Sequence, residues 1–188
     1  DEVARFIDLE INLHATHQDL VFEEFKDGFV GIRTHPDLRL TPSAKRGVHK
    51  VYGKARNSEG VEGKNIWGKR ADWVHYYGTI EGKQAGIAFF SHPSNLTKKG
   101  EKSWWHARDY GLISANPFAP TKIGGDGEHT VSKGQSLTLR YRFVFHSGSP
   151  EDAKIENRFA RYAQDPGHPT SIMPNHPGYP EDYLSPKK

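Results

Sequence analysis

The chain has 188 residues, with 26 Lys or Arg against 23 Asp or Glu and a formal net charge of +3 at pH 7. That length suffices for one domain with its own core, and an aromatic content of 12% argues against disorder. The absence of cysteine excludes disulfides and thiol catalysis, no apolar run is long enough to span a membrane, and the small net charge does not indicate a nucleic-acid partner.

The first strands are predicted near the N-terminus. Apolar residues alternate with polar ones between Arg5 and His14, which predicts a half-buried strand. Residues 20–25 and 28–35 predict two more strands on either side of Asp27-Gly28, because glycine accepts a positive φ at no steric cost.

Residues 43–68 show no periodicity and contain five glycines, which predicts a long irregular loop. From Ser43 to Arg70 there are eight Lys or Arg against two acidic residues. Such a basic segment is either a solvated loop or a contact for an anionic ligand, and the sequence leaves both interpretations open.

Regular structure is predicted again from residue 71 onward. Residues 71–80 and 84–92 flank a turn at Glu81–Lys83, and residues 136–146 alternate clearly. Ser149, Pro150 and the acidic residues after them predict a helix start, with an apolar stripe continuing to Gln164. The stripe consists of Ala153, Ile155 or Glu156, Phe159, Ala160 and Ala163.

Many short strands with one late helix predict a mainly β fold, an antiparallel β-sandwich with one C-terminal helix. One domain is expected over residues 1–165. Six prolines between Pro166 and Lys188 predict an extended tail over 166–188.

The segment Ser103–Phe118 contains the first candidate site. If it is extended, Trp104, His106 and Arg108 share one face, opposite Trp105. Tryptophan can stack on a sugar ring, histidine can transfer a proton near neutral pH, and arginine can bind an oxyanion with two parallel hydrogen bonds. The competing interpretation is that the tryptophans belong to the core.

Two further segments supply candidate residues. His92 is held extended by the following proline, and Asn95 lies in the turn after it. The glycine-rich loop Arg56–Arg70 supplies four more candidates, or is simply a surface loop. These four are Asn57, Glu59, Lys64 and Trp67.

No established catalytic motif occurs, which leaves acid–base chemistry by histidine and carboxylate or no catalysis. His14 and His17 would point to opposite faces of a strand, so no metal site is predicted. The sequence leaves any cofactor open.

Several segments together resemble the PmoA-like family, bacterial domains of unknown function of the DUF6807 type. They are "GIRTHPDLRL", "NSEGVEGKNIWGKRADWVHYYG", "GIAFFSHPSN", "WWHARDYGLISANPF" and "LRYRFVFHSGSPEDA". The resemblance covers about Arg5 to Ala163 and implies a β-sandwich of the large galactose-mutarotase-like kind, associated with carbohydrate metabolism. The location is left open, with a periplasmic or extracellular one favoured over the cytoplasm. It gives no support to methane monooxygenase activity.

Members of that family usually carry a further N-terminal portion with a His-Pro element and an "HHRG"-like element, neither of which occurs here. We therefore expect an N-terminally incomplete domain. Its open sheet edge would be paired by the missing segment or by a second copy of the chain.

Three functional interpretations follow. In the first, the chain is a sugar- or glycoside-processing enzyme (an epimerase, lyase or hydrolase) that uses His106, Arg108, His92 and Glu59. In the second, it is a carbohydrate-binding or structural module without turnover. In the third, it is an assembly protein.

Overall fold

The computed structural model describes residues 3–98 and 100–167. The larger sheet contains β1 (Ala4–His14), β4 (Lys54–Asn57), β6 (Trp73–Ile80), β7 (Lys83–Ser91) and β11 (Ser136–Ser147). The smaller sheet contains β3 (Val30–Arg33), β5 (Arg70–Ala71), β8 (Ser103–Ala107) and β9 (Leu112–Ala115). A separate pair contains β2 (Leu20–Phe22) and β10 (His129–Val131). The helices are α1 (Pro150–Ala153) and α2 (Ile155–Tyr162). The 3-10 helices are η1 (Pro36–Leu38), η2 (Ala44–Arg46), η3 (Gly63–Ile66) and η4 (Thr121–Ile123).

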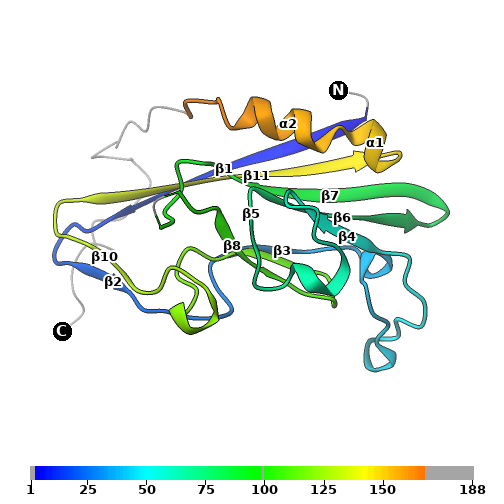
Figure 1. The fold of residues 1–188 in the computed structure, drawn as a ribbon, viewed down its shortest axis with the longest axis horizontal. Helices are drawn as coiled ribbons and strands as arrows, with labels where there is room; N and C mark the ends of the chain where they lie inside the picture. Colours follow the sequence, from blue (N-terminus) through cyan, green and yellow to red (C-terminus); the bar gives the residue numbers. More distant parts are fainter. Residues whose placement is uncertain (1–2, 99, 168–188) are drawn as a thin grey trace, which may run out of the picture.

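These elements stack as helices, larger sheet and smaller sheet, with every strand pair antiparallel (Figure 1). The strand orders are β1-β11-β7-β6-β4 in the larger sheet and β3-β9-β8-β5 in the smaller sheet. The predicted antiparallel, sandwich-like β fold with a C-terminal helical segment is thus confirmed.

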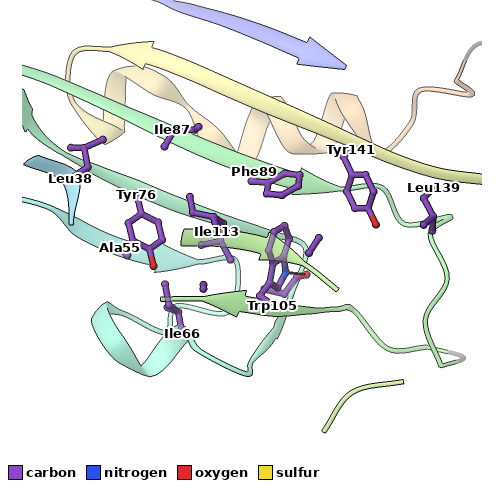
Figure 2. Packing of buried hydrophobic residues seen from close by; sticks show 14 residues of the cluster. Leu38, Ala55, Ile66, Tyr76, Ile87, Phe89, Trp105, Ile113, Leu139 and Tyr141 are labelled. Carbon is purple, nitrogen blue, oxygen red and sulfur yellow. Dashed lines mark hydrogen bonds between the residues drawn. The ribbon is translucent and has the colours of Figure 1, made fainter. Parts of the chain in front are cut away.

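The main core lies between the two sheets. Figure 2 shows Phe89 and Tyr141 of the larger sheet on one side and Trp105 and Ile113 of the smaller sheet on the other. The rings of Phe89 and Trp105 meet edge to face, 5.1 Å apart. A few large aromatic side chains therefore fill much of the core, which a chain with 35% hydrophobic residues needs.

The second core lies between the larger sheet and the helices. Phe90 and Val144 of the sheet pack with Ala153, Ile155 and Tyr162 of the helices. Because neighbouring residues of a strand point to opposite faces, β7 supplies Phe89 to one core and Phe90 to the other. The larger sheet is therefore covered on both faces over part of its length.

The helix start follows the sequence prediction closely. The Ser149 hydroxyl accepts a hydrogen bond from the Asp152 backbone N–H, and the Asp152 carboxylate accepts one from the Ser149 backbone N–H. The predicted single helix is interrupted at Lys154, which has a φ of 47°. The predicted stripe is right at Ala153, Ile155 and Phe159 but wrong at Ala160, which is exposed.

The hairpin prediction is also confirmed, since β6 and β7 pair from Trp73 to Ile80 around Glu81 and Gly82. The strands on either side of Asp27-Gly28 form but are shorter than predicted. β2 pairs with β10 and β3 with β9, so they do not pair with each other.

The prediction of an irregular loop over 43–68 is wrong at residues 54–57, which form β4 at an edge of the larger sheet. Only Ala55 and Asn57 of β4 are buried. An edge strand with one small apolar residue carries no alternating hydrophobic signal.

In the described residues no helix is both long and apolar enough to cross a membrane. Most of the predicted proline-rich tail, residues 168–188, lies outside the described residues.

Candidate functional site

Strand β8 places two predicted site residues on one face. Trp105 and Ala107 belong to the main core, so Trp104 and His106 point to the opposite, outer face of the smaller sheet. The ring centroids of Trp104 and His106 lie 6.2 Å apart. Arg108 follows directly after the strand.

Trp67 joins this face from the loop after η3. Its ring meets those of Trp104 and His106 nearly edge to face, at 6.1 and 6.4 Å. The guanidinium carbon of Arg108 lies 5.8 Å from the centroid of the Trp67 ring. Two segments that the sequence singled out separately therefore meet in one cluster, which we call the Trp67 cluster: Trp67, Trp104, His106 and Arg108.

The cluster is held by backbone hydrogen bonds across the adjoining chain. The Gly68 N–H donates to the Trp105 carbonyl at 2.9 Å, and the Trp105 N–H donates to the Lys69 carbonyl at 3.1 Å. The indole N–H of Trp104 donates to the Ile123 carbonyl. Trp67 itself stays 36% exposed, so one aromatic side chain of the cluster remains accessible.

Burial and one acidic neighbour act in opposite directions on the charge of His106. Its Nε2 lies 3.5 Å from a carboxylate oxygen of Asp27, a residue that the sequence indicated only as part of a turn. Burial lowers the pKa of His106; Asp27 opposes this shift, and Arg108 and Lys26 add to it. The Nδ1 atom is buried and has no hydrogen-bond partner within the described part of the chain. His106 is therefore expected to be neutral at pH 7.

His92 does not join the cluster. Its ring packs edge to face on Tyr162 of α2 at 5.3 Å, and its Nδ1 lies 2.7 Å from the Ser94 hydroxyl. Tyr162 covers the helix side of the larger sheet, whereas His106 faces away from that sheet on the far side of the smaller one. The two histidines thus lie on opposite sides of the sandwich and share no pocket.

Glu59 is engaged elsewhere. Its carboxylate lies 2.6 Å from the Lys102 ammonium and accepts a hydrogen bond from the Ser58 hydroxyl at 2.7 Å. The hydrogen bond from Lys102 is the main reason that the pKa of Glu59 is lowered. The structure therefore gives Glu59 an ion-pairing role, away from His106.

Four of the predicted ligand-binding residues occupy structural positions, among them Trp104, which is fully buried although it lies on the outer face of the smaller sheet. Asn57 accepts hydrogen bonds from the backbone N–H groups of Glu59 and Val61, which closes the turn after β4. Asn95 hydrogen-bonds both backbone groups of Arg140. Trp105 is fully buried in the main core.

Lys64 lies at the border of the cluster. It is exposed, and its ammonium is 4.0 Å from the carboxylate of Asp109, the residue after Arg108. Trp67, Arg108, Lys64 and Asp109 together offer one accessible ring and three charged groups. Such a surface can bind a polar ligand that has one apolar face.

A metal site does not emerge from the part of the chain that the structure covers, where no three His, Asp or Glu side chains are grouped closely enough to bind an ion.

Comparison with known proteins gives one result. Neither the curated proteins nor the solved structures contain a match to this chain. A family model described as a family of unknown function (DUF6807) matches residues 1–160, and the chain therefore belongs to that family.

Proposed function

We propose that this chain is a carbohydrate-binding domain whose ligand stacks on Trp67. The observation that supports this most is the accessible Trp67 ring, which is fixed in orientation by Trp104 and His106. The C–H face of a sugar ring is apolar and packs on an aromatic face, while its hydroxyl groups need polar partners.

The charged side chains around Trp67 supply such partners. Arg108, Lys64 and Asp109 can donate to or accept from sugar hydroxyl groups. Because the ring contacts already hold Trp67, little side-chain entropy would be lost on binding. The proposal agrees with the carbohydrate association, and with the galactose-mutarotase-like supersandwich, that the PmoA-like resemblance implies.

A binding experiment tests the proposal. A panel of neutral and acidic oligosaccharides is titrated while tryptophan fluorescence and heat are recorded. We expect Trp67→Ala to bind at least about tenfold more weakly, because one good aromatic contact contributes about that much affinity. The matched control is Phe6→Ala, since Phe6 is also an exposed aromatic residue but lies on the helix side of the larger sheet. Equal affinity of Trp67→Ala and the unaltered protein would refute the proposal.

Acid–base processing of a bound sugar is the second candidate, because His106 lies 3.5 Å from Asp27. His92 and Glu59 lie apart from His106 and Asp27, which weakens the enzymatic interpretation. His106 is only 1% exposed, so a substrate would have to displace Trp67 to reach the ring. The test is to incubate the chain with an oligosaccharide and to measure product. Loss of product formation in both His106→Asn and Asp27→Asn, with binding of the oligosaccharide retained, would favour this candidate.

An assembly role is the third candidate, because β1 is an edge strand. Within the described residues it pairs only with β11, and Phe6 and Ile7 are 53% and 57% exposed. An open edge of this kind can take up a further strand. Native mass spectrometry tests this by measuring the oligomeric state. A dimer that becomes a monomer in Ile7→Lys would favour assembly, and a monomer at all concentrations would oppose self-assembly.

A further inference from the structure

A hollow of about 440 Å³ lies beside the Trp67 cluster, between the β8–β9 turn and the chain around η1 and η2. Three arginines and one tyrosine line it together with apolar and hydroxyl side chains, and no acidic residue does. We call it the arginine pocket and define it by Arg33, Arg39, Arg46 and Tyr110.

The arginines of this pocket form no ion pair with a carboxylate of the described residues. None of the ion pairs in residues 3–98 and 100–167 involves Arg33, Arg39 or Arg46. By contrast, Arg70 pairs with Asp126 at 2.9 Å and Arg142 pairs with Asp8. Three guanidinium groups around one hollow, none of them ion-paired within the described residues, create a positive potential there.

Arg39 is the most deeply placed of the three, with only 8% of its surface exposed. Its Nε donates to the Thr41 carbonyl at 3.3 Å. Gly111 lies against its side chain with a φ of +83°, and a Cβ there would come within 3.3 Å of the Arg39 Cγ and 2.4 Å of the Thr34 hydroxyl. The glycine therefore lets the chain pack closely beside Arg39 and leaves no room for a larger residue.

Tyr110 connects the pocket to the Trp67 cluster. The guanidinium carbons of Arg33 and Arg108 lie 5.2 and 5.3 Å from the centroid of its ring. Arg108 in turn lies 5.8 Å from the Trp67 ring. Arginines and aromatic rings thus alternate along one continuous path from the pocket to the accessible tryptophan.

We propose that the arginine pocket binds the acidic group of an anionic saccharide, a carboxylate or a sulfate, while another ring of the same chain stacks on Trp67. This inference rests on the proposed function and narrows its ligand class. Arginine suits such a group because its planar fork donates two parallel hydrogen bonds to an oxyanion. The sequence leaves two interpretations of the basic segment from Ser43 to Arg70, a solvated loop or a contact for an anionic ligand. Arg46 belongs to that segment, so the proposal favours the second interpretation.

The first experiment compares acidic and neutral galactose-type oligosaccharides of the same length. Oligogalacturonate, a sulfated galactan oligomer and neutral galactan oligomers of the same length are titrated against the full chain. We expect at least one anionic probe to bind about tenfold or more tightly than the neutral one, with a preference that shrinks as salt is added. The uronate and sulfate arms show which acidic group is preferred.

The second experiment locates the effect. Arg33→Gln and Arg46→Gln are each expected to weaken the anionic probe about tenfold and to leave the neutral probe unchanged, because each removes one charge-assisted hydrogen bond. Lys45→Gln is the matched control, because it removes the same charge from the residue next to Arg46. Lys45 is exposed and does not line the pocket.

The outcomes separate the two proposals. Equal binding of neutral and anionic probes, both lost in Trp67→Ala, would overturn the arginine pocket but keep the proposed function. No binding of any saccharide would overturn both. If Lys45→Gln weakened the anionic probe as much as Arg46→Gln, the effect would come from general charge and the pocket would be refuted. Tighter binding of a single-stranded DNA oligomer than of any saccharide would also overturn the assignment.

Discussion

The Nε2 atoms of His75 and His146 lie 2.8 Å apart in the layer between the larger sheet and the helices, where both side chains are buried. His75 is on β6 and His146 is on β11, so the pair reaches across β7. Gly86 of β7 pairs with His146, and its missing side chain leaves room for this contact. Two neutral imidazoles can share one N–H···N hydrogen bond in this geometry.

Stability is predicted to fall as the pH falls through the titration range of these histidines. Burial is the first cause that lowers the pKa of both His75 and His146, and His75 is also close to His146 and Arg56. Below about pH 6.5 the unfolded chain therefore binds protons that the folded chain does not bind. This lowers the free energy of unfolding by up to about 1.4 kcal/mol per pH unit for each such histidine.

Urea unfolding at pH 7.5 and at pH 5.5 measures this loss. We expect His75→Gln to reduce the difference in free energy of unfolding between the two conditions. The control is His49→Gln, because His49 is exposed in the irregular segment. An unchanged difference in His75→Gln would show that the buried pair does not cause the pH dependence.

Gly86→Ala is predicted to destabilise the fold by about 1–3 kcal/mol, the usual cost of overpacking a well-packed site. A Cβ at this position would lie 2.3 Å from His146 Nε2 and 2.8 Å from the Tyr76 carbonyl oxygen. Urea unfolding of Gly86→Ala, His146→Ala and the double variant gives the coupling energy. The two effects should be less than additive, since His146→Ala removes one of the two clashes; strict additivity would contradict the packing argument.

Trp105→Ala and Trp67→Ala are predicted to differ in stability although both residues were candidate ligand contacts. Trp105 is fully buried, and its indole N–H donates to the Ala71 carbonyl at 2.8 Å. Its removal should cost about 3–5 kcal/mol. Trp67→Ala should cost much less because part of its ring already contacts water. Thermal unfolding compares them, and a larger loss for Trp67→Ala would contradict the core assignment of Trp105.

Glu81→Asn is predicted to stabilise the β6–β7 hairpin. Glu81 and Gly82 form the two-residue connection between Ile80 and Lys83, with φ angles of 50° and 80°. Asparagine tolerates this left-handed conformation better than glutamate, so we expect a gain of up to about 1 kcal/mol. Glu81→Ala is the control that removes the same charge without this preference, and it should not stabilise. Equal unfolding midpoints for the two variants would count against the turn argument.

Local patterns in the sequence predicted much of the fold. Alternation predicted β1 and β11, the Glu81-Gly82 turn predicted the β6–β7 hairpin, and Ser149 with Asp152 predicted the helix start. Each depends on residues close together in the chain, where side-chain periodicity and turn geometry act directly. The position of Trp104 and His106 on one face of β8 could be predicted for the same reason.

The grouping of the site could not be predicted in this way. Trp67 and Asp27 reach His106 from two other segments, whereas His92 and Glu59 lie elsewhere with Ser94 and Lys102. Strand pairing across long stretches of sequence decides which loops meet, and no local pattern encodes it.

Propensity and periodicity are local properties, so the sequence predicts most of the strands, the antiparallel β class and the residues capable of chemistry. It predicts neither β4 nor the interruption of the helix at Lys154. The packing of the two sheets sets which face of β8 is buried in the main core: Trp105 points into it and Trp104 points away from it, toward Trp67. The same packing brings Arg33, Arg39 and Arg46 around one hollow beside Tyr110. Burial and electrostatic potential depend on distances in space, and these distances follow from how the two sheets pack rather than from local sequence.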